Sequence, residues 1–247
     1  MNGPVRLAVW SGPRNISTAL MRSWENRPDT LVVDEPLYAA YLARTGIDHP
    51  GRADVLAAGE TDLERAAAAL TAPLPGDVRV HYQKHMCHHL PDGPVPEWVD
   101  ALTTVLLIRD PGEVVASYVR SRAAVGPADI GVHRQLDLLD RQLATGATPP
   151  VIDAGDFLRD PAGYLEWWCD WLGVAFTERM LRWPPGPRVS DGVWAPHWYA
   201  AVLASTGFEP WRPRQVDLAP PVAAVVDVCR PAYERLHARR VMPSTVR

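Results

Sequence analysis

The chain has 247 residues, enough to bury a sizeable core, and we expect a single α/β domain over residues 1–247. Its net charge of −4 predicts no broad basic face, which argues against a nucleic-acid partner. Cys87, Cys169 and Cys229 lack C-x-x-C spacing, which favours a reducing compartment over a disulfide framework. The N-terminal apolar run is too short for a signal peptide or a membrane span, so we expect a cytoplasmic protein without membrane partners.

The N-terminal half alternates between strand and helix signals. Residues 5–10 form an apolar run that predicts a buried strand. Residues 18–26 then have helical spacing, with Ser17 or Thr18 as the expected N-cap. We also expect strands at 30–36 and 77–85, and helices at 37–45 and 60–72.

The C-terminal half continues this alternation and then changes character. Residues 103–110 are the clearest buried strand, and Pro111 occupies the first position of a helix predicted over 111–122. Residues 184–215 are rich in Pro, Gly and Trp and predict a covering loop, or lid, around one helix. We further expect helices at 129–146, 161–174 and 219–240 and a strand within 149–157. Together these elements predict a three-layer α/β fold: a mostly parallel sheet of about five strands with helices on both faces.

The segment Ser11–Thr18, which reads SGPRNIST, connects the first strand to the first helix. A loop in this position presents backbone N–H groups and the positive end of a helix dipole, which suits an anion such as phosphate. Arg14 and the hydroxyl groups of Ser17 and Thr18 add donors. The segment lacks the G-x-x-x-x-G-K-[ST] pattern of nucleoside triphosphatases. An ordinary turn between strand and helix is the alternative.

A second anion site is predicted where strand 103–110 ends. Arg109 closes this strand and Ser117 follows eight residues later. Both side chains are expected at the carboxyl edge of the sheet, where open α/β folds bind ligands. The alternative is a surface pair between Arg109 and Asp110, with Ser117 an ordinary helical residue.

Lys84 is the only lysine of the chain and lies in a cluster of histidines. Its compact ammonium group differs chemically from the guanidinium groups that make up the remaining basic residues. If the cluster were helical, it would predict a zinc site. The strand pattern over 77–84 and the absence of nearby Asp or Glu argue against that alternative. The cluster consists of His81, His85, Cys87, His88 and His89.

The two loops resemble those of the sulfotransferases that use 3′-phosphoadenosine 5′-phosphosulfate (PAPS), in particular the bacterial small-molecule type. PRNIST (13–18) aligns with the P-K-S-G-T-T loop of that family. RDPGEVVASY (109–118) is close to R-[ND]-P-x-[DE]-x-x-x-S-x-Y. Segments 151–174 and 188–208 are similar to the late strand–helix segment and the closing loop of the family. The resemblance runs from about residue 5 to 208 and implies a fold like that of P-loop NTPases.

The resemblance also implies a donor site that needs no metal. The loop 13–18 would hold the 5′-phosphosulfate group, and Arg109 and Ser117 the 3′-phosphate, with Arg188 as a second cation. Arg14 replaces the usual loop lysine and Ile16 the usual loop glycine, which are departures from the family pattern. The implied residues that bind PAPS, or the product adenosine 3′,5′-bisphosphate (PAP), are Pro13, Arg14, Asn15, Ile16, Ser17, Thr18, Arg109, Ser117 and Arg188.

Catalytic roles follow from the same resemblance. Lys84 lies where many members have a K-T-H-like segment, and it would neutralise the leaving oxygen in place of the missing loop lysine, beside Arg14. Glu35 matches the general base of the tyrosyl-protein and bacterial trehalose sulfotransferases. The alternative for Asp34 and Glu35 is that they cap the next helix. His85, and after it His88 and His89, are further candidates for the base.

The expected reaction is transfer of a sulfuryl group from PAPS to a hydroxyl or an amine of a small molecule. The resemblance also implies a homodimer. The alternatives are a P-loop-like nucleotide-binding protein or kinase without sulfuryl transfer, and a zinc-dependent enzyme that uses His81–His89. The residues expected to contact the acceptor are His88, His89, Trp194 and Tyr199, together with Trp198.

Overall fold

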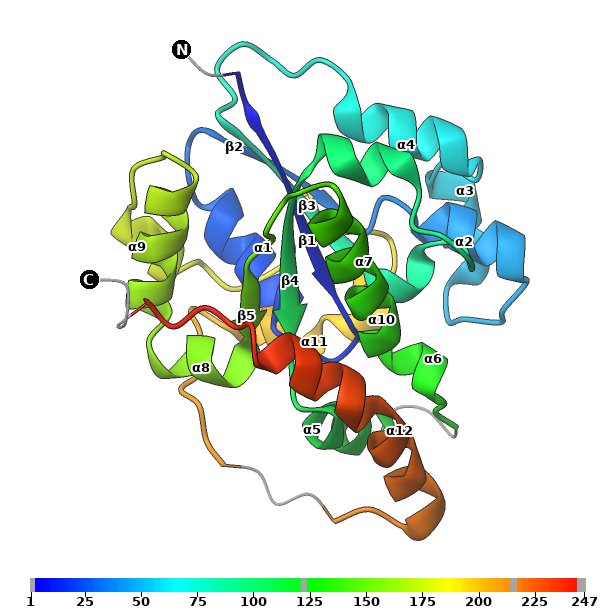
Figure 1. The fold of residues 1–247 in the computed structure, drawn as a ribbon. Helices are drawn as coiled ribbons and strands as arrows, with labels where there is room; N and C mark the ends of the chain where they lie inside the picture. The colour runs from blue at the N-terminus through cyan, green and yellow to red at the C-terminus, as the bar shows by residue number, and fades with distance from the viewer. Residues whose placement is uncertain (1–2, 121–123, 214–216, 244–247) are drawn as a thin grey trace.

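The protein is built on a five-stranded sheet in which all neighbouring strands are parallel (Figure 1). The computed structural model describes residues 3–120, 124–213 and 217–243. The strand order is β2-β3-β1-β4-β5, so β1 lies at the centre between β3 and β4. The strands are β1 Val5–Ser11, β2 Thr30–Asp34, β3 Val80–Met86, β4 Thr103–Ile108 and β5 Val151–Asp153.

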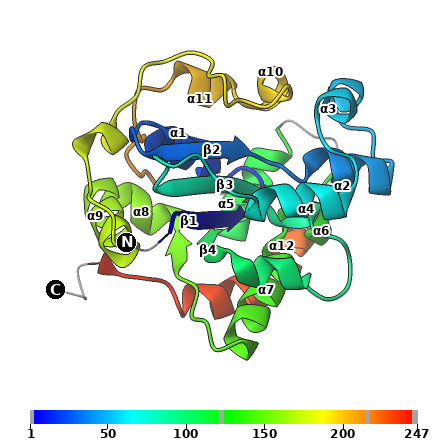
Figure 2. The ribbon, with the colours of Figure 1, turned by 90° about the horizontal axis from the view of Figure 1, so that it is seen from above.

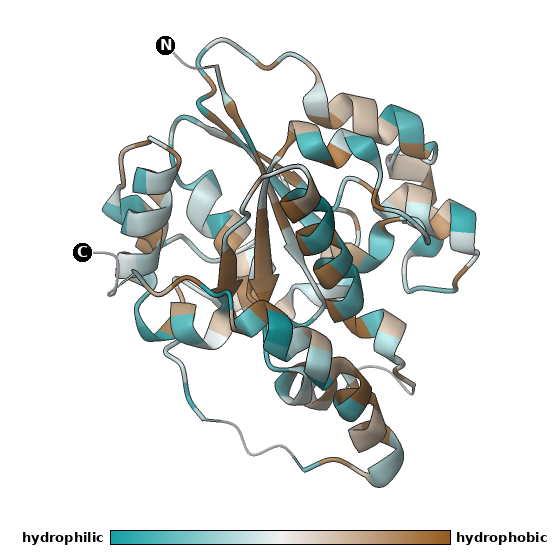
Figure 3. Cartoon of the chain, viewed as in Figure 1, coloured by the Kyte–Doolittle hydropathy of each residue, from teal (hydrophilic) through white to brown (hydrophobic). Residues whose placement is uncertain are grey.

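Both faces of the sheet are covered by helices, as expected. Successive side chains of a strand point to opposite faces, so Leu7 and Val9 enter one core while Ala8 and Trp10 enter the other. Helices α1, α8 and α9 pack on the first face, and α4, α5, α7 and α12 on the second. Figure 3 shows the apolar character of the central strands between these layers. The bounds are α1 Ser17–Glu25, α4 Leu63–Thr71, α5 Pro111–Tyr118, α7 Val132–Ala144, α8 Ala154–Arg159, α9 Pro161–Trp171 and α12 Pro220–His237.

Two of the helix starts test the capping predictions. Helix α5 begins as expected: Pro111 is its first residue, and Asp110 accepts hydrogen bonds from the amides of Gly112 and Glu113. The expectation that Ser17 or Thr18 caps α1 is wrong. Ile16 holds the N-cap position without a side-chain bond, because Ser17 already lies inside the helix.

Elsewhere the predicted elements are shifted or divided. The long helix expected over 129–146 is two helices, because Gly131 has a φ of 76° and interrupts the α conformation. The helix predicted over 111–122 ends at Tyr118, and its residues 121–122 lie outside the described residues. The remaining elements are α2 Tyr38–Thr45, α3 Arg52–Ala58, α6 Pro127–Ile130, and the 3₁₀ turns η1 Cys87–His89, η2 Glu97–Ala101 and η3 Glu178–Leu181.

The Pro- and Trp-rich segment contains two short helices, α10 Ala195–Trp198 and α11 Ala200–Ala204, where one was expected. Figure 2 shows both on the side of the molecule that carries α1 and β2. Arg22 of α1 is buried and forms an ion pair with Asp191, which fixes the start of this segment. Residues 214–215 of the predicted lid lie outside the described residues.

Candidate active site at the carboxyl edge of the sheet

A cavity of about 480 Å³ opens where β1, β3 and β4 end. This volume lies within the range of about 300–1,000 Å³ that is usual for small-molecule sites. Its walls come from the β1–α1 loop, the ends of β2 and β3, the β4–α5 region and the segment α10–α11. The residues that line it include Arg14, Asn15, Ser17, Thr18, Glu35, Tyr38, His49, Lys84, Met86, His88, His89, Arg109, Ser117, Tyr118, Arg120, Trp198, Tyr199 and Ser205.

The β1–α1 loop is held in a tight conformation. A Cβ atom on Gly12 would lie 2.2 Å from the carbonyl oxygen of Ile130, so only glycine fits there. Arg14 has a φ of 55°, an unfavourable left-handed conformation for a residue with a Cβ. Asn15 donates from Nδ2 to the carbonyl of Leu107 in β4 and accepts from the amide of Ile16. These contacts direct the first turn of α1 toward the cavity, where its early N–H groups lack helical partners.

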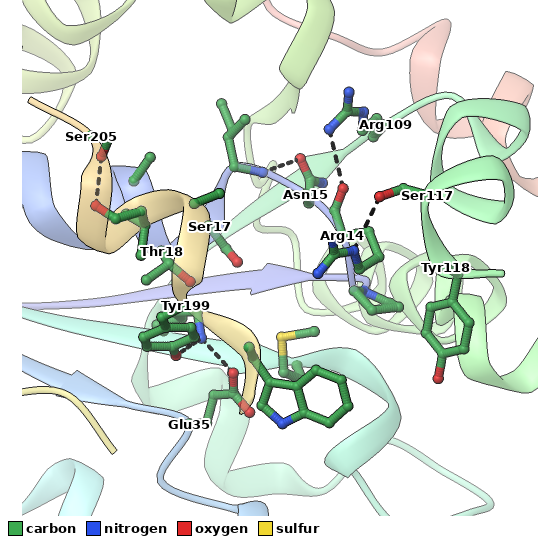
Figure 4. Close-up of a pocket in the computed structure, with 18 of the residues that line it drawn as sticks. Arg14, Asn15, Ser17, Thr18, Glu35, Arg109, Ser117, Tyr118, Tyr199 and Ser205 are labelled. Carbon is green, nitrogen blue, oxygen red and sulfur yellow. Dashed lines mark hydrogen bonds and ion pairs between the residues drawn. The ribbon is translucent and has the colours of Figure 1, made fainter. Parts of the chain in front are cut away.

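The structure brings Arg14, Arg109 and Ser117 together, although they are far apart in the sequence (Figure 4). Arg14 Nε donates to Ser117 Oγ at 3.1 Å, and Arg109 Nη1 donates to the carbonyl of Arg14 at 3.1 Å. Glu113, one helical turn on, accepts from Nε and Nη2 of Arg109 and fixes this guanidinium. Arg120 lines the same cavity. This end of the cavity therefore combines three guanidinium groups with a helix N-terminus, which is a donor set for an anion with more than one phosphate.

The other reactive part of the cavity is a buried ion cluster around Lys84. The parallel register places Lys84 opposite Asp34, and its Nζ lies 2.8 Å from Asp34 Oδ1. Nζ also donates to Glu35 Oε1 at 2.5 Å and to Tyr199 Oη at 2.8 Å. An ammonium group has three N–H donors, so these three acceptors occupy all of them.

The electrostatics of this cluster are set by burial and by the charges within it. Burial raises the pKa of Glu35 above its ordinary value, although Lys84 opposes the shift; the negative charge of Asp34 adds to it. Burial works against the ammonium of Lys84, but Asp34 and Glu35 outweigh it and hold its pKa well above the usual value. Burial likewise raises the pKa of Tyr199. At neutral pH the cluster therefore contains an ammonium, an intact phenol and a carboxylate that takes up a proton unusually easily.

The histidine cluster is divided by the geometry of β3. Neighbours in a strand point to opposite faces, so His85 lies on the face away from Lys84. Its ring stacks on Trp10 at 4.0 Å, and its Nε2 contacts Gln83 Oε1 at 3.2 Å. Gln83 in turn contacts His81. His85 does not line the cavity, so the structure does not support it as the base.

His88 and His89 do line the cavity, beyond Glu35. His89 stacks on Tyr38 with ring centroids 4.7 Å apart, and its Nε2 lies 4.0 Å from Glu35 Oε2. Burial lowers the pKa of His88 to about 4 and that of His89 well below its usual value. Both rings are therefore neutral at pH 7, so this wall is aromatic and uncharged.

Two residues expected at the site lie elsewhere. Arg188 is not among the residues lining the cavity; its guanidinium lies 4.0 Å from Glu25 and its amide donates to Asp191. The fold of this segment against α1 thus keeps Arg188 away from Arg109. Trp194 is also behind the wall, where its ring packs edge-on against Tyr38 and its Nε1 donates to Tyr199.

Several lining residues were not singled out from the sequence. Tyr38 follows Glu35 by three residues, and its hydroxyl bonds His49 Nδ1 at 2.8 Å. Arg120 follows Ser117 by three residues, which helical spacing would have placed on the same side. His49, Met86 and Ser205 carried no sequence signal, because only the tertiary fold brings their segments to the cavity.

Among the residues with described positions, no group of three or more His, Cys, Asp or Glu is arranged to hold a metal ion. In the histidine cluster, His81 and His85 both contact Gln83, whereas His88 and His89 line the cavity, so these rings do not surround a common point. No helix in the described part of the chain is long and apolar enough to cross a membrane.

Residues 5–239 match the family model described as a sulfotransferase domain. The chain belongs to the sulfotransferase domain family. Two solved structures share its fold. The sulfotransferase domain from the curacin biosynthetic pathway is 16% identical, with a TM-score of 0.53, and the match covers 93% of this chain and 99% of that one. The sulfotransferase from Alicyclobacillus acidocaldarius is 14% identical, with a TM-score of 0.54, and the match covers both chains completely.

Curated relatives in Arabidopsis thaliana are closer in sequence. Branched-chain-amino-acid aminotransferase-like protein 1 is 37% identical over 211 residues, which are 84% of this chain and 37% of that protein. Branched-chain-amino-acid aminotransferase-like protein 2 is 34% identical over 203 residues, 81% of this chain and 35% of that protein. The chain spans little more than a third of these relatives, so an aminotransferase-like name does not describe the shared segment in particular.

Proposed function

We propose that this sulfotransferase family member transfers a sulfuryl group from PAPS to a hydroxyl, or an amine, of a small-molecule acceptor. The observation that carries the proposal is one cavity in which a cluster of guanidinium groups and a buried lysine–glutamate pair occupy neighbouring walls. Arg14, Arg109 and Ser117 belong to the first wall, and Lys84 and Glu35 to the second.

The donor fits the residues of the first wall. The N-terminal turn of α1, with Ser17 and Thr18, supplies amides and hydroxyls for the 5′-phosphosulfate group. Arg109 and Ser117 supply a cation and a hydroxyl for the 3′-phosphate, and Arg120 can replace Arg188 as the second cation there. When bound, PAPS supplies an activated sulfuryl group, and the segment 184–213 would close over it.

Glu35 is the proposed general base. Its carboxylate lies in the cavity, and its raised pKa helps it to accept a proton from the acceptor hydroxyl. All three N–H groups of Lys84 are occupied while Glu35 is ionised. Once Glu35 is protonated, its hold on Lys84 weakens and one N–H of the ammonium is released. That N–H is then available to stabilise negative charge on the departing oxygen, as cations do in phosphoryl transfer.

The acceptor would lie against the aromatic wall formed by Tyr38, His49, His89 and Trp198, next to Glu35. These rings contact one another: Tyr38 stacks on His89, and His49 lies edge-on to Trp198 at 6.4 Å. Because burial keeps the imidazoles of His88 and His89 neutral at pH 7, neither of them offers a cation to an acidic acceptor. The acceptor class that fits is a neutral hydroxyl compound or an amine.

The test is isothermal titration with PAP, with adenosine 5′-phosphate as the reference ligand and no added metal. We expect micromolar binding of PAP and much weaker binding of adenosine 5′-phosphate. Arg109→Ala should weaken PAP binding by roughly 10- to 100-fold, as for loss of a charge-assisted bond of about 1.5–3 kcal/mol. Arg235→Ala, which removes an exposed cation paired with Asp140, is the control. Equal binding of both nucleotides, or an Arg109 variant that binds like the control, would remove the donor assignment.

A further inference from the structure

Asp34 is buried and contacts two separate parts of the cavity wall. Its Oδ1 accepts from Lys84 Nζ at 2.8 Å. Its Oδ2 accepts from the hydroxyl of Tyr199 at 2.7 Å and from the amide of Gly192 at 3.2 Å. One carboxylate thus faces β3 with one oxygen and the segment 192–199 with the other.

Tyr199 completes this connection. Its hydroxyl donates to Asp34 and accepts from Lys84 Nζ and from Trp194 Nε1 at 3.1 Å. A hydroxyl offers one donor and two acceptor sites, so all three are used. Gly192 is held tightly as well, because a Cβ there would lie 2.1 Å from the ring of Trp194. The segment therefore has one preferred position relative to Asp34.

The same segment carries part of the cavity wall. Trp198 and Tyr199 of this segment line the cavity, and so do Val202 and Ser205, which follow it along the chain. Displacement of this segment from β2 would break the hydrogen bond between Tyr199 and Lys84 and would remove two of the three hydrogen-bond donors of Asp34. The charge distribution around Lys84 and Glu35 consequently depends on whether the segment is seated, that is, hydrogen-bonded to Asp34.

We propose that Asp34 is a positioning residue that couples the seating of segment 192–199 to the placement of the Lys84 ammonium and, through it, of the Glu35 carboxylate. This inference rests on the proposed function, because it concerns the lysine and glutamate assigned there. The arrangement that supports turnover forms when Tyr199 and Gly192 of this segment are hydrogen-bonded to Asp34. The coupling prevents the lysine and the base from being aligned in a cavity that is still open to water.

Asp34→Asn changes the shape of the side chain little but prevents it from accepting hydrogen bonds from both Lys84 and the segment 192–199. An asparagine side chain has one acceptor oxygen, which cannot bond both Lys84 and the Tyr199–Gly192 side. Trypsin reports on the segment without any need for turnover: it cleaves after arginine, and Arg188 is followed by Val189, which is fully exposed. Asp140→Asn, which removes an exposed carboxylate paired with Arg235, is the matched control.

We expect cleavage after Arg188 to be several-fold faster in Asp34→Asn than in the wild type or in Asp140→Asn. We also expect it to be faster in Lys84→Met, because the ammonium that neutralises Asp34 and bonds Tyr199 is absent. PAP binding should slow cleavage in the wild type more than in either variant. If Asp34→Asn is cut at the control rate, the coupling does not exist. If only Asp34→Asn is cut faster and Lys84→Met is not, Asp34 is a structural anchor alone.

A second measurement separates positioning from simple anchoring in the active enzyme. The charged or titratable groups facing Glu35 are Lys84 of β3, Asp34 of β2, Tyr199 of the α10–α11 segment and His89 of η1. Lys84 lowers the pKa of Glu35 more than Asp34 raises it, so loss of the placement of Lys84 in Asp34→Asn should move the acid limb of kcat/KM to higher pH. A limb that moves to lower pH, as loss of the Asp34 charge alone would give, would overturn the proposal. The trypsin result without nucleotide does not depend on PAPS being the donor. The positioning role of Asp34 and the donor assignment can therefore fail independently.

Discussion

At the scale of single residues, the site depends on a buried lysine whose hydrogen-bonding capacity is filled by its neighbours. Lys84 is 1% exposed, and breaking a buried pair of this kind leaves an uncompensated charge. Glu35 is in a left-handed conformation with a φ of 42°, although it has a Cβ. Such backbone strain gathers at functional positions. It directs the Glu35 carboxylate toward the Lys84 ammonium.

The two members of the Lys84–Glu35 pair should differ in their pH profiles. Glu35→Gln and Lys84→Met should each lower kcat by roughly 10²-fold or more, with PAP affinity near that of the wild type. In Lys84→Met the acid limb of kcat/KM should move to higher pH, because the cation that lowers the pKa of Glu35 is gone. In Glu35→Gln that limb should disappear. Rates measured across pH with an acceptor found by screening test this, and an acid limb that survives in Glu35→Gln would assign the base to another residue.

At the scale of elements, the strands were the most predictable part of the site. The strands and their mostly parallel sheet were predicted from short apolar runs that alternate with helices. The register of β2 against β3, which only the structure shows, explains why Lys84 meets Asp34. The alternation of side chains along β3 separates Lys84 from His85, a consequence of the predicted strand that grouping by sequence proximity overlooked. The break at Gly131 and the contacts of Arg188 and Trp194 depend on tertiary packing, which local patterns do not encode.

Gly12 packs the β1–α1 loop, which we propose binds the 5′-phosphosulfate group, against the end of α6, and this predicts an effect on both stability and binding. In Gly12→Ala the new Cβ would meet the backbone carbonyl of Ile130, so the loop must shift. We expect a loss of stability of about 1–3 kcal/mol and several-fold weaker PAP binding. Gly76→Ala is the matched control, because nothing lies within 4 Å of its new methyl group. Denaturant unfolding and calorimetry measure the two effects; a variant as stable as the control would show that the loop accommodates a side chain.

At the scale of the whole molecule, two apolar cores on opposite faces of the sheet leave the reactive groups at one edge. The fold class and the two loops at this edge followed from the order of the elements and from the resemblance of the loop sequences. The lining contributed by Tyr38, His49 and Ser205 did not, because segments separated along the chain meet only in the folded protein. For Asp34 the sequence predicts only a helix-capping role, because its partners lie on β3 and on the segment 192–199.

The buried histidines predict a loss of stability in acid. Burial lowers the pKa of His85 to about 3 and that of His88 to about 4, whereas unfolded histidine titrates near 6.5. Below about pH 6.5 the unfolded chain therefore binds more protons than the folded chain, and the free energy of unfolding falls as the pH is lowered toward the folded-state values.

His85→Gln removes one of these sites while keeping a polar side chain beside Gln83. Between about pH 6 and pH 4 its free energy of unfolding should fall less steeply than that of the wild type, by about 1.4 kcal/mol per pH unit for one proton. His133→Gln, at an exposed position, is the control substitution. Urea unfolding at a series of pH values gives the slopes. Parallel curves for His85→Gln and the wild type would mean that the folded protein protonates His85 without cost, contrary to its stacking on Trp10 inside the core.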